Sequence, residues 1–400
     1  MEGRCFGVLK NWTPPSSCSK QQKVRPEDEL LKPALELLAQ LRADASAWSR
    51  LRFEVRNHEQ HGRRDRNASL RLQLAWALQH AFCSSDEPLL RFALQEEVLW
   101  REQDPWQGIG ETLEILGAIT ACRRDVQDVW MLARAKQANF DTGCGFDLYH
   151  LFAAGVEQTI AYVQAGERSE HEDVLRLLLD EQGQPRCDDL EVNAWLESRP
   201  DQLPLDKGSQ SRIWFERALA AGRHDLASQL LDERIKQEAG DASARHSYVY
   251  DLESLERWAE ASELRKERFA LVEDAFDKAG EARDIARLER LAQHPGEAER
   301  WLQVAAKLHA DHEDWRQVGL GRMFVEECFR VAIALGPQAG GEIFCLGDKF
   351  AQSTPRLPLV ALEAAVEAAQ LFQSARLSHY KQQQAREARR IGNLSGGPKA

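Results

Sequence analysis

Two stretches of this chain, RHDLASQLLDERI at Arg223–Ile235 and RWAEASELRKERF at Arg257–Phe269, carry most of the information about its fold. They share Arg, Ala, Ser, Leu, Glu and Arg at the same places. A fixed spacing between two helical patterns indicates a repeated unit, which buries its apolar face only by stacking on its neighbours. We therefore expect stacked helix pairs in this part of the chain.

A turn signature recurs beside these stretches. The sequence AGRHDL at 221–226 resembles ACRRDV at 121–126, and AGEARDIA at 279–286 is a looser copy. Glycine just past a helix takes the left-handed conformation that closes it, and a following aspartate can cap the next helix. Each copy therefore predicts a tight turn between two antiparallel helices. Trp214 and Tyr248, which are separated by the same spacing, would occupy the same packing position in successive first helices.

The spacing, about 34 residues, resembles the period of the tetratricopeptide repeat (TPR), a helix–turn–helix unit. Ala227 and Ala261 match the small residue of that family's second helix, against which the first helix packs closely. The clear match covers 211–275. The resemblance implies an α-solenoid of antiparallel, TPR-like helix pairs, in which first-helix side chains over 211–335 line a concave face that grips a peptide or a protein domain.

Helical patterns fill the chain from residue 26 onward, and they predict an all-α fold with two sub-domains. Apolar residues recur at helical spacing, and no stretch alternates as a strand would. The clearest break is RPDQLPLDKGSQ at 199–210, which holds two prolines and a glycine. We expect an irregular segment at 1–25, an N-terminal helical domain at 26–198, a linker at 199–210, a TPR-like helical domain at 211–380 and a basic, partly disordered tail at 381–400.

Composition limits the classes of function. No apolar run approaches the roughly 18 residues of a membrane span, and the first residues lack the apolar stretch of a signal peptide, so we expect a soluble, cytoplasmic protein. Its eight cysteines are scattered without a C-x-x-C pair, which favours neither a zinc ribbon nor a disulfide scaffold. The net charge of −12 disfavours nucleic-acid binding and suits a basic protein partner, although solubility alone would also explain it.

The most unusual local sequence is ANFDTGCGFDLYH at 138–150, in which two glycines flank a cysteine. If a helix begins near Gly143, the side chains of Cys144, Asp147 and His150 fall on one face of it. A cysteine and a histidine oriented by a carboxylate form the arrangement of a cysteine nucleophile. This segment is therefore the candidate site for an enzyme.

The same segment also fits a structured helix-to-helix turn that contacts a partner. Asp141 or Thr142 would cap a helix, the glycines would allow the bend, and phenylalanines would anchor it. We favour this interpretation, because sequential neighbours on one helix seldom build the pocket that a nucleophile and its base need. The partner-binding candidates are Phe140, Asp141 and Asp147 in this turn, together with Trp214, Tyr248, Asp251 and Trp258.

Other groups of residues are less specific. Histidines three apart within 58–61 and 309–312 are conceivable metal ligands, but neither pair is H-E-x-x-H, and we interpret them as surface histidines. We expect no metal and no cofactor. Basic residues gather at 56–66 and at 376–390, and since only Tyr380 accompanies them they read as solvated faces, with weak RNA contact as the minor alternative.

These observations predict a non-enzymatic helical-repeat protein that holds or sequesters a partner, most simply a basic protein. An acidic, rigid groove that covers the active face of a basic toxin, as an immunity-type inhibitor does, is one form of this function. An adaptor or chaperone scaffold fits the same residues. A cysteine-dependent enzyme centred on Cys144 is the alternative from another class. No nucleic-acid or membrane partner is expected.

Overall fold

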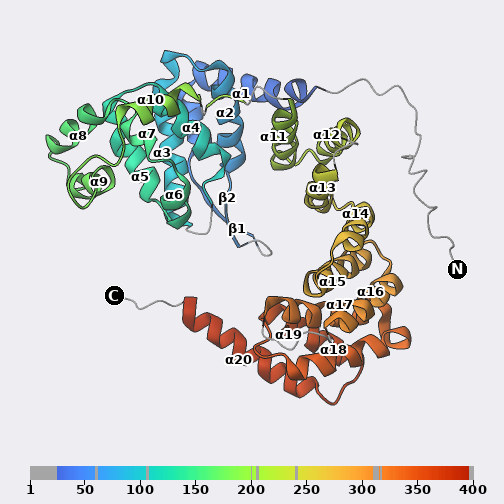
Figure 1. Ribbon diagram of the computed structural model, residues 1–400. Coiled ribbons are helices and arrows are strands. Elements are labelled where there is room, and N and C mark those ends of the chain that lie inside the picture. The colour runs from blue at the N-terminus through green and yellow to red at the C-terminus, as the bar shows by residue number, and fades with distance from the viewer. Residues whose placement is uncertain are drawn as a thin grey trace. The chain divides into compact units, whose positions relative to one another are not determined.

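A computed structural model describes residues 25–58, 62–104, 108–199, 201–203, 207–238, 242–309, 315 and 318–395. Nearly all the regular structure in these residues is helical, which confirms the all-α prediction (Figure 1). The contacts divide the chain into two compact units, which we call unit 1 (Met1–Ala227) and unit 2 (Ser228–Ala400) and describe separately. None of the described helices is both long and apolar enough to cross a membrane.

Unit 1 is built around α2, which packs against α1 and α4, while α3 packs against α4 and α5. Most residues of α4 are buried, and its Leu113 and Leu116 belong to the same core as Trp76 of α2. The elements are η1 (Glu27–Leu31), α1 (Lys32–Ala43), η2 (Ala45–Leu51), α2 (Ala68–Ala81), η3 (Ser84–Asp86), α3 (Glu87–Gln103), α4 (Gly110–Cys122), η4 (Val126–Asp128), α5 (Val129–Gln137), α6 (Phe140–Gly145), α7 (Tyr149–Phe152), α8 (Val156–Gln164), α9 (His171–Leu178), α10 (Asp189–Glu197) and α11 (Lys207–Ala220).

Unit 1 also holds a β-hairpin that the sequence did not predict. Strands β1 (Val55–His58) and β2 (Gly62–Asp65) pair antiparallel, in a segment interpreted above as a solvated face. The base of the hairpin is fixed by the buried carboxylate of Asp65, which bonds to Arg71 and accepts the N–H of Glu54 at 3.0 Å. Arg71 in turn donates to Glu97 at 2.8 Å. Each strand has only four residues, too few for an alternating pattern to stand out.

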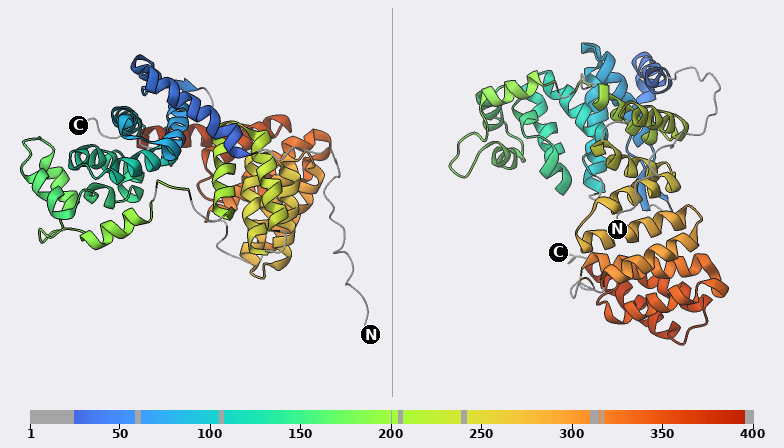
Figure 2. Two further views of the ribbon diagram at one scale, coloured as in Figure 1. Left: turned by 90° about the horizontal axis from the view of Figure 1, so that it is seen from above. Right: turned by 45° about the vertical axis from the view of Figure 1, so that its right-hand side comes forward.

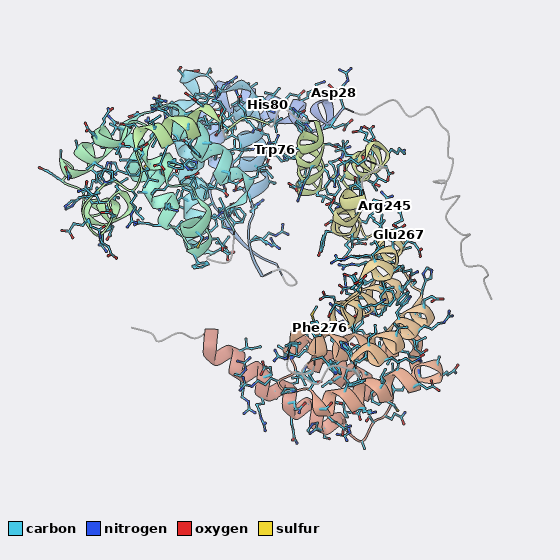
Figure 3. The ribbon with its side chains drawn as sticks, viewed as in Figure 1. Asp28, Trp76, His80, Arg245, Glu267 and Phe276 are labelled. Carbon is cyan, nitrogen blue, oxygen red and sulfur yellow. The ribbon has the colours of Figure 1, made fainter. Side chains whose placement is uncertain are left out.

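Unit 2 consists of helices that pack mostly on their neighbours in sequence, as the right-hand view of Figure 2 shows for its later helices. Between α13 and α14 an ion pair of 2.8 Å joins Arg245 to Glu267 (Figure 3). The core gathers around α17, where Phe324 and Phe329 are fully buried. The helices are α12 (His224–Gln237), which crosses the division, α13 (Ala242–Ser254), α14 (Trp258–Leu271), α15 (Ala275–Leu291), α16 (Pro295–His309), α17 (Gly319–Ala339), α18 (Gly341–Ser353), α19 (Leu359–Leu371) and α20 (Leu377–Ser395).

The predicted repeat spacing is present in the helices themselves. Helices α12 and α14 are equally long, so their first residues, His224 and Trp258, are separated by the same interval as their last residues. The turn before each has the same geometry, with a left-handed residue at Gly222 (φ 70°) and at Glu256 (φ 57°). The N–H groups of Arg223 and Arg257 each donate to the carbonyl five residues earlier, at 2.8 and 2.9 Å, which is the Schellman ending of a helix.

The division between the units falls later in the chain than the predicted linker at 199–210. Helix α11 belongs to unit 1 because Arg217 fixes it there. The guanidinium of Arg217 donates to Glu111 at 2.7 Å and to Gln79 at 2.6 Å, and it lies over the ring of Trp76 at 5.4 Å. A proline- and glycine-rich segment therefore does not separate α11 from the helices that precede it.

The end of the chain contains a kink and a long last helix. The sequence GPQAGG at 336–341 coincides with the kink, at Gly336 (φ 76°, ψ 175°), after which α18 begins at Gly341. The tail expected from residue 381 is part of α20, which continues to Ser395, while 396–400 lie outside the described residues. Residues 1–24 of the predicted irregular segment also lie outside them.

Candidate functional site

The segment around Cys144 is a rigid turn that presents Phe140 to solvent. Asn139 and Thr142 cap α6 reciprocally, each side-chain oxygen accepting the other's backbone N–H at 2.9 to 3.0 Å. Lys136 closes the other end, because its ammonium donates to the carbonyls of Gly143 and Phe146 at 2.8 and 2.6 Å. The ring of Phe140 is 80% exposed. The N-cap residue is thus Asn139, and the predicted Thr142 completes the capping box, whereas the predicted Asp141 does not cap the helix.

The predicted nucleophile arrangement is not present. Helix α6 ends at Gly145 and α7 begins at Tyr149, so Cys144 and His150 do not share a helical face. Cys144 is exposed, whereas His150 is buried and stacks on Phe146 at 4.1 Å between ring centroids. The Asp147 carboxylate accepts the N–H of Tyr149 at 3.1 Å, and among the described residues no hydrogen bond joins it or His150 to Cys144.

His150 is a neutral core side chain. Its Nδ1 lies 2.8 Å from the Asp147 carbonyl, to which the neutral ring donates, and its edge meets Trp195 at 4.6 Å. Burial lowers the pKa of His150 to about 4, well below its ordinary value. The ring therefore carries no charge at neutral pH and stabilises the packing between α7 and α10.

A group of carboxylates gathers where α7 meets α10. The carboxylates of Glu191, Asp147 and Asp188 raise the pKa of the Tyr149 hydroxyl, which places all three within electrostatic range of one phenol. Burial, followed by the same carboxylates and that of Asp189, raises the pKa of the Cys187 thiol to about 12. We call the surface formed by Asp147, Asp188, Asp189, Leu190 and Glu191 the acidic patch.

The patch is held rigid because its carboxylates are also structural acceptors. Asp188 caps α10 by accepting the N–H of Glu191 at 2.9 Å, and the Glu191 carboxylate accepts the N–H of Asp188 at 3.1 Å. Asp189 accepts the N–H of Val156 at 2.9 Å, which ties the start of α8 to α10. Asp188, Asp189 and Glu191 nevertheless remain exposed, so each presents negative charge to solvent.

Leu190 lies between Asp189 and Glu191 in the first turn of α10 and is 80% exposed. The buried face of α10 is formed by Val192 and Leu196, which lie on the opposite side of the helix. Leu190 was not among the residues predicted from the sequence to bind a partner. Its position in the helical pattern could have revealed it. Leu190 stands two residues before the core residue Val192, so the two cannot lie on the same face of a helix, and its neighbours in sequence are acidic.

Two predicted partner-binding residues are core residues instead. Trp214 is 4% exposed and lies beneath the guanidinium of Arg217, 5.1 Å from the ring centroid. Tyr248 is 1% exposed, donates its hydroxyl to Glu238 and lies beneath Arg234 at 4.9 Å. A partner could reach neither ring without unpacking the helices. Their burial removes both as contact residues.

The remaining candidates have mixed surroundings. Asp251 accepts a hydrogen bond from Arg234 at 2.6 Å, so its charge is already neutralised. Trp258, at the start of α14, and Asp141, on α6, are half-buried. Tyr250, which was not among the predicted candidates, is 64% exposed on α13. Asp141 thus belongs to unit 1, whereas Tyr250, Asp251 and Trp258 belong to unit 2.

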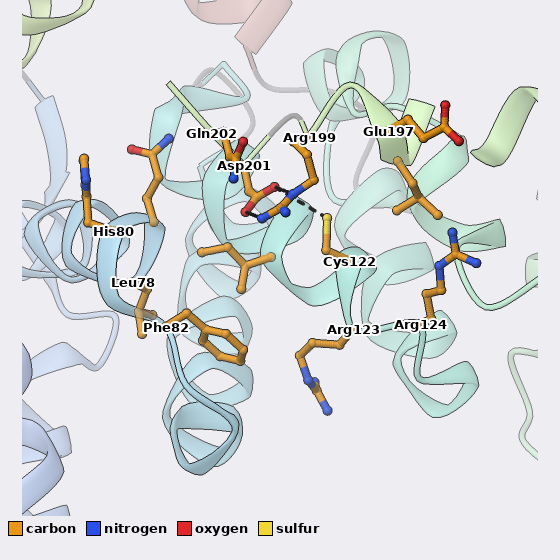
Figure 4. Close-up of a pocket in the computed structure, with 13 residues that line it drawn as sticks. Leu78, His80, Phe82, Cys122, Arg123, Arg124, Glu197, Arg199, Asp201 and Gln202 are labelled. Atoms are coloured by element: carbon orange, nitrogen blue, oxygen red, sulfur yellow. Dashed lines mark hydrogen bonds and ion pairs between the residues drawn. The ribbon is translucent and has the colours of Figure 1, made fainter. Parts of the chain in front are cut away.

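A hollow of about 670 Å³ lies in unit 1 among the ends of α2, α4 and α10 (Figure 4). Its arginines already have partners, since Arg199 holds Asp201 at 3.1 Å and Arg124 donates to Asn193 at 2.8 Å. Cys122 lies 3.6 Å from Asp201, and burial beside that carboxylate raises the pKa of its thiol to about 12. The thiol is therefore protonated at neutral pH and is not an activated nucleophile.

The prediction that the paired histidines lie on the surface is wrong for His309. His309 is fully buried and stacks on Trp315 with 4.1 Å between ring centroids. Its predicted companion at 312, and His61 of the other pair, lie outside the described residues. Among the residues that the structure describes, no three His, Cys, Asp or Glu side chains gather as they would around a metal ion.

Comparison with known proteins adds no further site. The sequence matches no family model, and no curated protein is significantly similar to it. The acidic patch is therefore interpreted from its own geometry and charge.

Proposed function

We propose that this chain is a non-enzymatic protein-binding protein that holds a basic partner on the acidic patch. The observation that carries the proposal is Leu190, an apolar side chain left 80% exposed with the carboxylates of Asp188, Asp189 and Glu191 around it. An apolar centre within a polar rim is the composition of a binding hot spot. The carboxylates add selectivity, because they attract basic surfaces and repel acidic ones.

Rigidity supports the same proposal. The patch is fixed by the α10 cap and by the bond from Val156 to Asp189, so a partner would meet it already in place. Binding to such a surface loses little conformational entropy. Phe140 is a second exposed anchor on an equally fixed turn of unit 1, and Asp141 beside it continues the acidic character.

The proposal extends to the repeated helices. We propose that α12 to α16 belong to a TPR-like solenoid, supported by the equal spacing at both ends of α12 and α14 and by their matching turns. Solenoids of this kind bind proteins along an extended face. Tyr250 is exposed on α13, a first helix, and is the aromatic residue best placed to contribute to such a face.

Sequestration of a basic toxin, in the manner of an immunity-type inhibitor, is the form of this function that the net charge of −12 favours. An adaptor or chaperone scaffold would use the same surface. A cysteine-dependent enzyme is disfavoured, because Cys144 and His150 lie on separate short helices and the Cys122 thiol has a raised pKa.

The test compares two matched substitutions, Leu190→Arg and Leu271→Arg. Both replace exposed leucines, 80% and 71% exposed, so both variants should fold. Each purified protein is used to capture proteins from a lysate of the producing cells, and the captured protein is identified by mass spectrometry and then titrated by calorimetry. We expect one basic protein, released at high salt and bound about 30-fold more weakly by Leu190→Arg, as for loss of a hot spot of about 2 kcal/mol.

The Leu271→Arg variant should bind this protein like the wild type. Equal affinity of the Leu190→Arg variant and the wild type would refute the acidic patch as the binding surface. Capture of an acidic protein, or of one whose binding is insensitive to salt, would refute the electrostatic part of the proposal.

A further inference from the structure

The last helix of unit 2 is packed over only part of its length. The first half of α20 rests on α19, with Tyr380 buried and its hydroxyl donating to Asp348 at 2.6 Å. From residue 385 to 392 every side chain except that of Glu387 is exposed, and Figure 1 shows this part of α20 running out beyond α19. We call residues 385–392 the basic end.

The basic end carries positive charge that the rest of unit 2 does not neutralise. Arg386 has no ion pair or hydrogen bond within the described part of the chain, and Arg389 donates only to the carbonyl of Ala385 in its own helix, at 3.1 Å. Arg390 alone is paired, with Glu387 at 2.6 Å. An unpacked helical stretch of this length is marginal in water, so contact with another surface would stabilise it.

We propose that the basic end docks on the acidic patch of a second copy of this chain. This inference rests on the proposed function, in that it takes the acidic patch to be a docking surface. The two surfaces are complementary in charge, since the unpaired arginines Arg386 and Arg389 face a partner bearing several exposed carboxylates. They also match in apolar content, because Ile391, 39% exposed on the basic end, corresponds to Leu190 in the patch.

The charge of the whole chain makes this docking conditional on ionic strength. Two copies with a net charge of −12 repel each other, and only the local match of basic end and acidic patch opposes that repulsion. Salt weakens attraction between exposed charges, since the screening length is about 8 Å at physiological ionic strength and shorter above it. The association is therefore expected to be strongest at moderate to low salt and absent at high salt.

The pairing joins different surfaces of the two copies, so it is heterologous. Such contacts build rings or open chains unless two copies exchange their basic ends reciprocally. In every case an occupied patch is closed to a basic partner protein. Self-association and partner binding are then competing states of one surface, and a basic partner should dissociate the assembly.

The experiment is sedimentation equilibrium of the full chain over a range of concentrations, at low salt and at about 0.5 M salt. The wild type should rise above its monomer mass of 45.4 kDa with concentration at low salt and return to it at high salt. Two variants should each weaken association at least about tenfold: the double substitution Arg386→Glu with Arg389→Glu, and the single substitution Leu190→Arg. Leu271→Arg is the matched control and should associate like the wild type.

Combining Leu190→Arg with the two glutamate substitutions should not recover association, because the exposed carboxylates of Asp188, Asp189 and Glu191 would repel the new glutamates. A wild type that stays monomeric at every concentration would overturn the inference. So would association lost through the glutamate substitutions but untouched by Leu190→Arg, since the basic end would then dock elsewhere. If the wild type is monomeric but still captures a basic protein through Leu190, only the self-association is refuted. If it self-associates but captures no partner, only the proposed function is refuted.

Discussion

At the scale of single residues, several helices end on a residue that is in the left-handed backbone conformation but is not glycine. Left-handed residues other than glycine occur at Arg124, Arg199, Glu256, Gln293, Arg356 and Gln373. Glu256, Gln293 and Gln373 each stand in the same Schellman hydrogen-bond pattern as Gly222. A residue with a Cβ atom pays roughly 1 kcal/mol or more in this conformation.

Replacing Glu256 or Gln293 by glycine should therefore stabilise the protein by about 0.5–1 kcal/mol, because relief of the backbone conformation exceeds the added entropy of the unfolded chain. The free energy of unfolding, measured in urea, checks the expectation. Gly222→Ala is the reverse control at the equivalent turn and should destabilise by a similar amount. A lower free energy of unfolding in both the Glu256→Gly and the Gln293→Gly variant would contradict this expectation.

His150 should make stability depend on pH. Its pKa is about 4 in the folded protein and near 6.5 when unfolded, so between these values only the unfolded chain takes up the proton. The free energy of unfolding should then fall as the pH drops from about 6.5 to 4, by up to about 3 kcal/mol, and be insensitive to this group above pH 7.

The matched variant is His150→Phe, which keeps an aromatic ring beside Phe146 and Trp195 but cannot titrate. Its stability relative to the wild type should rise steadily as the pH falls through this window. Parallel pH profiles of the two proteins, obtained from urea unfolding at each pH, would show that His150 is not the group responsible.

At the scale of elements, α11 depends on one buried side chain. Arg217 is 1% exposed and bonds to Glu111 and Gln79 while covering Trp76, whose indole N–H also donates to Glu111 at 2.9 Å. Arg217→Ala should destabilise unit 1 by about 2–4 kcal/mol, since it removes charge-assisted hydrogen bonds of a buried guanidinium and leaves Glu111 with only the Trp76 donor.

The control lies on the same helix. Arg212 forms an exposed pair with Glu216, and Arg212→Ala should change stability by less than about 0.5 kcal/mol. Hydrogen exchange of the α11 amides, followed by mass spectrometry, should show faster exchange in Arg217→Ala only. Equal exchange in both variants would mean that α11 is held by its other contacts.

The elements also show what sequence patterns reveal and what they miss. Helices with a regular apolar stripe were predictable, and so was the spacing of α12 and α14, because both depend on local periodicity. The hairpin was not, since its strands are short and its base is set by Asp65 contacting Arg71 and Glu54. The acidic patch was only partly predicted, through Asp147, because its other members come from α10, which no pattern places beside α7.

At the scale of the whole molecule, each unit has a separate apolar core. The core of unit 1 lies within 34–196, and that of unit 2 lies within 282–380. We expect two unfolding transitions in scanning calorimetry. Leu116→Ala should lower the midpoint temperature of one transition only, and Leu302→Ala that of the other only. Each substitution should reduce the free energy of unfolding of its unit by about 2–5 kcal/mol, because both leucines are fully buried. A single transition that shifts in both variants would show that the units unfold together.

The division of the chain could be predicted only approximately from its sequence. Proline and glycine mark the segment 199–210 as irregular, but they do not reveal on which side a following helix packs. That is decided by the contact between Arg217 and Glu111, which are 106 residues apart. No local pattern encodes a contact at this separation, which is why α11 was grouped with the wrong neighbours.

The double role of the carboxylates at α10 restricts how this surface can diverge. Asp188 and Glu191 close the helix start, and Asp189 holds the first amide of α8, so replacing any of them loosens the scaffold along with the charge. The side chain of Leu190 has no such structural role. If the patch binds a partner protein, as we propose, a change of partner would require substitution mainly at residue 190, because its acidic neighbours are needed for the fold. Selectivity among related chains is then expected to depend mainly on this position.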